Sequence, residues 1–183
     1  MIKVEYRSLS SSSIVSLSSD FKLTNNFVLG ELANNEGNPA KVQYIISNYS
    51  MVFNELLQRF RDIYGKPIDP TSGYRQPEYN KKVGGSSNSL HLQACAMDFV
   101  DKYKKYPEWM ISTWLRILNS ANYIGAINIY DNNGLYRYHV EAFSDVFLKA
   151  ETSMLRVYTN GDQFTKLAAI YKPLGVEVTY HGK

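Results

Sequence analysis

Two histidines and an aspartate are the residues whose chemistry and spacing point to a metal site in this sequence. His91 lies in S-L-H-L-Q-A-C-A-M-D, seven residues before Asp98, and His139 lies farther along the chain in Y-H-V-E. Two imidazoles and one carboxylate leave a fourth coordination position open, as a catalytic zinc ion requires. The structural alternative is that each histidine is only a hydrogen-bonded residue of the core.

The spacing of His91 and Asp98 sets a condition on the chain between them. Their separation is odd, so on a regular strand the two side chains would point to opposite faces. A turn or bulge at Gln93-Ala94-Cys95 would bring them together. Cys95 is a rival ligand because thiolates bind zinc, but its alanine neighbours favour a small buried core residue.

The apolar periodicity predicts the elements that must position these residues. Apolar residues recur at three- and four-residue steps over residues 42–64, which predicts an amphipathic helix that Gly65-Lys66-Pro67 ends. A second helix is predicted over residues 106–119. Strands are expected at residues 68–73, 94–100, 124–130, 136–143, 155–159 and 176–180, with a further helix at 162–171.

The order of these elements predicts an α+β fold, a small antiparallel sheet with flanking helices, because strands and helices do not alternate regularly. Residues 131–134, Asp-Asn-Asn-Gly, give a strong hairpin signal between two of the strands. We expect a serine-rich arm over residues 1–26, a core over 27–146, and a C-terminal extension over 147–183 that packs on the core.

The composition excludes several classes of protein. The chain has 183 residues, of which 44% are hydrophobic and 20% charged, which argues against disorder. A single cysteine rules out an internal disulfide, and no apolar run is long enough to span a bilayer. The net charge is +3, and the basic residues are spread along the chain rather than clustered, which does not support nucleic-acid binding. The small positive charge is compatible with a mild attraction to an anionic polymer such as a cell wall.

Residues 65–100 resemble the zinc D-Ala-D-Ala carboxypeptidases and related cell-wall peptidases, a group that includes lysostaphin-like enzymes and hedgehog domains. The family pattern is S-G-Y-R, then N-x-x-V-G-G, then S-x-H-x-x-G-x-A-x-D, and much later H-x-D or H-x-E. The matching residues are Ser72–Arg75, Asn80, Val83–Gly85, Ser89, His91, Ala96, Asp98, His139 and Glu141. One departure is Ala94, where the family usually has glycine; if that position has positive φ, alanine is strained there.

The resemblance implies roles for individual residues and a fold of the hedgehog and D-Ala-D-Ala metallopeptidase type. His91, Asp98 and His139 would be the zinc ligands. Arg75 would hold the carboxylate or carbonyl of the substrate, which suits a planar guanidinium. Ser89 would donate a hydrogen bond near the site, or it only caps the loop. Zinc in such an enzyme polarises the scissile carbonyl and activates water.

The general base is the least defined of these roles. Several relatives place an acidic residue three positions before the last zinc histidine, where this chain has Tyr136. Glu141 shares a strand face with His139 and is the base that we favour, with support of His139 as its alternative role. Asp131 lies at the mouth of the hairpin and is the second candidate, although aspartate also commonly begins such turns.

Together these expectations describe a zinc metallopeptidase that hydrolyses peptide bonds of bacterial peptidoglycan, as a D,D-carboxypeptidase or endopeptidase. The sequence shows no cleavable signal peptide. We therefore expect synthesis in the cytoplasm and action on the cell wall after release, as in a phage-type endolysin. The alternatives are a cytosolic D-Ala-D-Ala dipeptidase, a zinc-bearing wall-binding module without catalysis, and a structural virion component that docks on the wall.

Overall fold

The computed structural model describes residues 1–7, 10–33, 42–103, 107–132, 135–143, 152–159 and 161–181. The chain forms two compact units, Met1–Met97 and Asp98–Lys183. This division falls inside the core predicted over residues 27–146, and the boundaries predicted near residues 26 and 146 stay predictions. Among the described residues, no helix has the length and apolar character needed to cross a bilayer.

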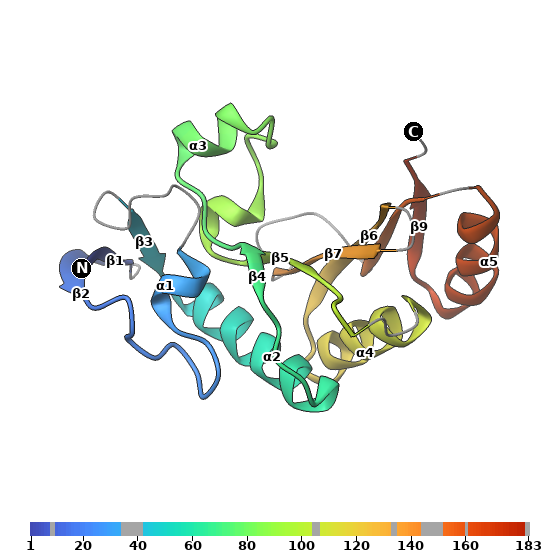
Figure 1. Ribbon diagram of the computed structural model, residues 1–183, viewed down its shortest axis with the longest axis horizontal. Helices are drawn as coiled ribbons and strands as arrows, with labels where there is room; N and C mark the ends of the chain where they lie inside the picture. Colours follow the sequence, from blue (N-terminus) through green and yellow to red (C-terminus); the bar gives the residue numbers. More distant parts are fainter. Residues whose placement is uncertain are drawn as a thin grey trace. The chain divides into compact units, whose positions relative to one another are not determined.

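Three strands form the sheet of the first unit (Figure 1): β1 (Ile2–Arg7), β2 (Ser12–Leu17) and β3 (Gln43–Ile46). The strand order is β2-β1-β3, and β1 runs antiparallel to β2 and parallel to β3. The serine-rich segment that the sequence predicts as an extended arm is thus a paired strand over residues 12–17. Its side chains are almost all exposed, as is typical of an edge strand.

Helix α2 (Asn48–Tyr64) is the amphipathic helix that the sequence predicts, but it begins six residues later than expected. The preceding Tyr44-Ile45-Ile46 forms β3 instead, because these residues suit a half-buried strand and pair with β1. Ser47 then caps the helix, and its hydroxyl accepts a hydrogen bond from the backbone N–H of Ser50. Gly65 ends α2 in the left-handed conformation, with a φ of 70°.

Four short elements carry the sequence motifs: β4 (Pro70–Ser72), α3 (Pro77–Lys82), the 3-10 helix η2 (Leu90–Gln93) and β5 (Ala96–Val100). Strand β4 neighbours β5 in the sheet order, and β5 crosses the division between the units. The strand predicted from residue 94 begins two residues later, because Ala94 ends η2 in the left-handed conformation with a φ of 54°. This is the turn that the odd spacing of His91 and Asp98 requires.

The sheet of the second unit has the order β5-β7-β6-β8-β9. Its strands after β5 are β6 (Ile124–Asn132), β7 (Leu135–Phe143), β8 (Met154–Tyr158) and β9 (Glu177–Tyr180). Strands β6 and β7 are antiparallel, whereas β8 is parallel to both β6 and β9. The predicted α+β class is confirmed, but the sheet is mixed rather than purely antiparallel, because β8 and β9 are joined by a crossover helix.

Two helices cover the apolar side of this sheet: α4 (Pro107–Ser120) and α5 (Gly161–Tyr171), the latter followed by the 3-10 helix η3 (Lys172–Leu174). Trp114 of α4 is fully buried, and its indole N–H donates to the carbonyl of Ala126 at 3.1 Å. The hydroxyl of Tyr171 in α5 donates to the carbonyl of Glu108 at 2.9 Å. The described part of the C-terminal extension is therefore built into the sheet and helices of this unit.

The left-handed conformation of Ala94 yields a stability prediction. Ala94→Val places a β-branched side chain at positive φ in a buried position, so we expect the free energy of unfolding to fall by roughly 2 kcal/mol or more. Denaturant unfolding monitored by circular dichroism measures this change. The matched control is Ala169→Val on the exposed side of α5, which should cost only about 0.5 kcal/mol. Equal losses in the two variants would contradict strain at residue 94.

Candidate metal centre

The S-G-Y-R segment holds His91 through both its ring and its backbone. Nδ1 of His91 lies 2.6 Å from the carbonyl oxygen of Gly73, and the backbone N–H of Arg75 donates to the carbonyl of His91 at 3.0 Å. A carbonyl can only accept, so Nδ1 carries the proton and Nε2 keeps the lone pair that a metal needs. The His91 side chain is also buried, which restricts the ring to this orientation.

Glycine is required at position 73 because the chain there touches helix α1 (Leu29–Leu32). The backbone N–H of Tyr74 donates to the carbonyl of Leu32 at 2.6 Å. A Cβ atom on Gly73 would lie 2.1 Å from that same carbonyl oxygen. The sequence identified this glycine only through the family resemblance, because its neighbour lies far away along the chain.

The N-x-x-V-G-G motif closes the loop that precedes His91. The side-chain amide of Asn80 donates to the carbonyl of Ser86 at 2.8 Å, and the backbone N–H of Gly85 donates to the carbonyl of Asn80 at 2.8 Å. Asn80 is buried, and a Cβ atom on Gly85 would lie 2.1 Å from its side-chain oxygen. This motif therefore shapes the loop that leads into η2.

Ser89 and Arg75, the two predicted substrate-binding residues, both lie beside His91 in the first unit. Ser89 caps η2, and its hydroxyl accepts a hydrogen bond from the backbone N–H of His91 at 3.4 Å. Arg75 is half-buried, and its Nε donates to the hydroxyl of Ser72 at 2.8 Å. Ser89 therefore caps this turn, which is one of the two roles that the sequence predicts for it. Substrate binding by Ser89 or Arg75 stays a prediction.

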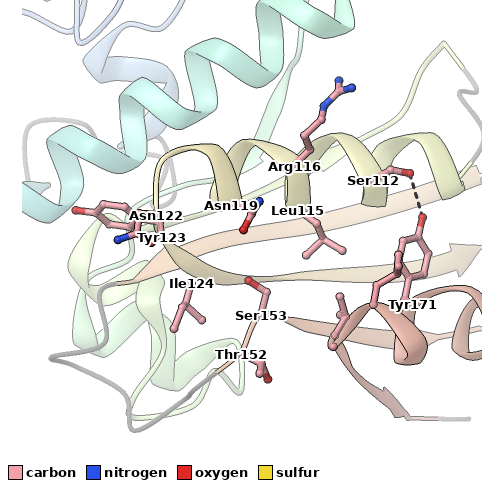
Figure 2. A pocket seen from close by; sticks show the side chains of 13 residues that line it. Ser112, Leu115, Arg116, Asn119, Asn122, Tyr123, Ile124, Thr152, Ser153 and Tyr171 are labelled. Atoms are coloured by element: carbon pink, nitrogen blue, oxygen red, sulfur yellow. Dashed lines mark hydrogen bonds between the residues drawn. The ribbon is translucent and has the colours of Figure 1, made fainter.

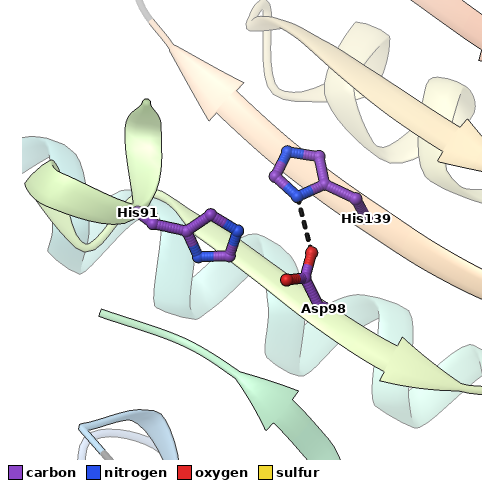
Figure 3. Close-up of side chains that lie close together, drawn as sticks. All are labelled: His91, Asp98 and His139. Atoms are coloured by element: carbon purple, nitrogen blue, oxygen red, sulfur yellow. Dashed lines mark hydrogen bonds and ion pairs between the residues drawn. The ribbon is translucent and has the colours of Figure 1, made fainter. Parts of the chain in front are cut away.

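In the second unit, His139 on β7 lies between two carboxylates. Its Nδ1 is 2.7 Å from Oδ1 of Asp98 on β5, and its Nε2 is 2.8 Å from Oε2 of Glu141. Figure 3 shows the Asp98 carboxylate pointing at the His139 ring. His139 and Glu141 are two residues apart on one strand and share a face, as their spacing predicts.

The three predicted ligands form one group. His91, Asp98 and His139 each offer one ligand atom, and these atoms all lie within 4.8 Å of one another (Figure 3). Imidazole nitrogen and carboxylate oxygen are ligands that zinc prefers, and each ring has its second nitrogen next to a hydrogen-bond acceptor. The donor set therefore fits a metal ion of the zinc type.

The carboxylates control the protonation of His139. Burial alone would lower the pKa of His139, but the hydrogen bonds to Asp98 and Glu141 and the charges of both residues raise it to about 9. Burial alone would raise the pKa of Glu141, but His139 and Arg156 hold it below its usual value. In the metal-free protein at neutral pH, a cationic His139 is thus balanced by anionic neighbours.

Cys95 and Asp131 lie apart from this group. Burial raises the pKa of the Cys95 thiol to about 12, and its sulfur donates to the carbonyl of Gln93, so Cys95 is a protonated core residue rather than a ligand. Asp131 lies three residues beyond Asn128, the register partner of His139, and therefore on the opposite face of β6. Residues 133 and 134 of the predicted turn lie outside the described residues.

A separate cavity of about 730 Å³ lies between α4 and the C-terminal segment of the second unit (Figure 2). At its edge, the hydroxyls of Ser112 and Tyr171 are 3.1 Å apart. The lining residues include Arg116, Asn119 and Tyr123, and no histidine, cysteine or carboxylate is among them. Among the described residues, the lining of this cavity therefore offers no set of metal ligands.

The contact between Gly73 and α1 leads to a prediction about folding. Gly73→Ala forces a backbone shift away from Leu32, so we expect a loss of roughly 2–3 kcal/mol in the free energy of unfolding. Gly161→Ala is the matched control, because the added Cβ would meet only the Tyr180 hydroxyl, at 4.0 Å. Chemical denaturation of both variants measures the difference. A Gly73→Ala protein as stable as the control would show that the close approach does not exist in solution.

The raised pKa of His139 predicts a pH-dependent stability of the metal-free protein. The folded-state pKa lies above the unfolded value near 6.5, so the stabilisation is complete below about pH 6.5 and is lost as the pH rises through about 9. We expect the free energy of unfolding to fall by roughly 3 kcal/mol over this interval. His139→Gln removes the titrating group, so the difference between the two profiles isolates it. Parallel profiles would refute the prediction.

Comparison with known proteins identifies the family. The family model described as Peptidase M15 matches residues 25–133, which is more than half of the chain. The matched segment includes Arg75, Ser89, His91 and Asp98 and ends before His139. No curated protein matches the chain. The chain belongs to the peptidase M15 family, the zinc D-Ala-D-Ala carboxypeptidase family that its motifs resemble.

Proposed function

We propose that this protein is a zinc-dependent peptidase that hydrolyses peptide bonds of bacterial peptidoglycan, as a D,D-carboxypeptidase or endopeptidase. The observation that carries the proposal is the grouping of His91, Asp98 and His139, with one ligand atom each, in a chain of a peptidase family. We further propose the bacterial cell wall as the place of action, as in a phage-type endolysin, because peptidoglycan and its stem peptides lie there.

The ligands that we propose for zinc are Nε2 of His91, a carboxylate oxygen of Asp98 and Nδ1 of His139. The hydrogen bond from His91 Nδ1 to the Gly73 carbonyl supports the choice of Nε2. The position of His139 Nδ1 beside Asp98 supports the choice of Nδ1. When bound, zinc supplies a Lewis acid for the scissile carbonyl and activates water near neutral pH.

Arg75 is the residue that we propose for binding the substrate. The hydrogen bond from its Nε to Ser72 fixes the plane of the guanidinium, so that the cation presents a defined edge. A carboxylate or a carbonyl that gains negative charge during hydrolysis would suit this group. Ser89 caps η2, the 3-10 helix that carries His91, and so helps to hold that residue in place.

Glu141 is the carboxylate that we propose for proton handling at the centre. Its Oε2 lies 2.8 Å from Nε2 of His139, so it accepts a hydrogen bond from that N–H and leaves Nδ1 for the metal. Its Oε1 is bound by Arg156, which favours this supporting role over that of general base. Asp131 has less support as general base, because its strand position faces away from His139.

A zinc-bearing module without catalysis is the second candidate function. Tyr136 stands where several relatives have the general base, and its hydroxyl accepts a hydrogen bond from the side-chain amide of Gln163 at 3.3 Å. This chain therefore has no carboxylate at that position. This candidate keeps the zinc ion and the attraction to the wall but loses hydrolysis.

Mass spectrometry of fragments released from purified peptidoglycan tests the proposed function. We expect the wild-type protein to carry one zinc ion per chain and to release stem-peptide fragments or free D-Ala. Chelation and His91→Ala should abolish release, because both remove the metal. His181→Ala is the matched control, an exposed histidine outside the ligand group, and should retain zinc and activity.

The other outcomes separate the alternatives. Intact sacculi together with hydrolysis of free D-Ala-D-Ala would indicate a precursor dipeptidase. Intact sacculi with stoichiometric zinc and no dipeptidase activity would indicate the module without catalysis. Co-sedimentation with sacculi that persists in His91→Ala, without cleavage in any sample, would favour a structural docking protein. A wild-type protein that binds no zinc would refute the proposal altogether.

A further inference from the structure

Arg156 contacts Glu141, the carboxylate beside the proposed ligand His139, from a strand that lies beyond the family match. It is on β8, whereas the family match ends at residue 133 and the last matching motif residue is Glu141. Neither the spacing of the motifs nor the family pattern gives this residue a role. Its position in the sheet, however, places it next to residues that do have one.

The strand register puts Arg156 on the same face as His139. Asn128 of β6 is paired with His139 on one side and with Arg156 on the other, so the three residues form a row across β7, β6 and β8. The next row contains Glu141 opposite Ala126. Because alanine is small, the Arg156 side chain can pass diagonally over β6 and reach Glu141.

The contacts form a continuous chain of hydrogen bonds that ends at His139. Nη1 of Arg156 donates to Oε1 of Glu141 at 3.0 Å and to the side-chain oxygen of Asn128 at 3.2 Å. The other carboxylate oxygen of Glu141 lies 2.8 Å from Nε2 of His139. The Glu141 side chain is only 9% exposed and that of Arg156 only 25%, so solvent screens this ion pair weakly.

The ion pair of Arg156 with Glu141 compensates a buried negative charge beside His139. A buried carboxylate is costly unless a cation and hydrogen bonds compensate it, and a second carboxylate, that of Asp98, flanks the same ring. The guanidinium of Arg156 compensates Glu141 and fixes its orientation at the same time. Glu141 can then accept a hydrogen bond from the Nε2–H of His139, so that Nδ1 is the nitrogen left for a metal on the side of Asp98.

We propose that Arg156 is a positioning residue of the metal centre, which acts through Glu141 on the orientation and tautomer of the His139 ring. The inference rests on the proposed function, because it assumes that His139 is a metal ligand. It adds that a C-terminal strand outside the recognised family segment completes the site. Partners of this kind, one contact removed from the metal, commonly change metal affinity by about 10–100-fold.

Zinc affinity measured by competition with a chromophoric chelator, at constant pH, is the first test. Arg156→Ala should weaken zinc binding about 10–100-fold. Arg156→Lys keeps a cation that can reach Glu141, so it should restore binding to within about 5-fold of wild type. Arg116→Ala is the matched control, because Arg116 is exposed on α4 and lies outside the hydrogen-bonded chain; its zinc affinity should equal that of wild type.

A double-mutant cycle then asks whether Arg156 acts through Glu141. Glu141→Gln should weaken zinc binding by itself, and adding Arg156→Ala to it should change the affinity by less than about 2-fold. A purely structural role for Arg156 would instead give independent, multiplicative losses. Nitrogen NMR of the zinc-loaded protein adds a direct signature: the Nε2–H resonance of His139 should be visible in wild type and lost or broadened in Arg156→Ala.

Each outcome bears on a specific claim. A wild-type protein that binds no zinc would refute the proposed function and this inference with it. A wild-type protein that binds zinc and cleaves peptidoglycan, together with an Arg156→Ala protein of equal affinity, would overturn only the role of Arg156. If Arg156→Ala does not fold, as judged by thermal denaturation, Arg156→Gln and Arg156→Lys decide, because both retain hydrogen bonding and only lysine retains the charge.

Discussion

The arrangement of Asp98, His139 and Glu141 depends on one constraint, the placement of the His139 ring between the two carboxylates. Asp98 approaches one ring nitrogen and Glu141 the other, and a single imidazole thereby links β5 to β7. Without that ring, the buried carboxylate of Glu141 and the half-buried carboxylate of Asp98 would repel one another. The cost of bringing them together is offset by the proton on His139, by Arg156, and by a metal ion when one binds.

The same principle operates at His91 with neutral groups. A backbone carbonyl, that of Gly73, takes the place that Glu141 takes at His139. Each acceptor orients its ring and holds the N–H of one nitrogen, so that the other nitrogen faces the metal when one binds. The two rings differ in surroundings. The acceptor of His91 depends on a glycine pressed against Leu32, whereas the acceptor of His139 depends on a charge supplied by β8. Backbone contact sets one tautomer and electrostatics sets the other.

The C-terminal segment extends the sheet of the second unit and also reaches the residues beside His139. Strands β8 and β9 with helix α5 form a crossover unit that extends the sheet of the second unit and packs Tyr171 and Lys166 against α4. The buried side of β8 contributes Leu155 and Val157 to the core, while its other side carries Arg156. One strand thus contributes to stability on one face and to the electrostatics of the site on the other.

The sequence by itself predicted the three candidate ligands, through the motifs that it shares with the family. It also predicted the amphipathic helix before Gly65 and the hairpin of β6 and β7, because these depend on residue type and on local periodicity. It also required a turn between His91 and Asp98, which Ala94 provides. Only the tertiary structure decided the parallel pairing of β8, the contact of Gly73 with Leu32 and the reach of Arg156 to Glu141. These contacts join residues that are distant along the chain, and no local pattern encodes which strands become neighbours or which charges meet.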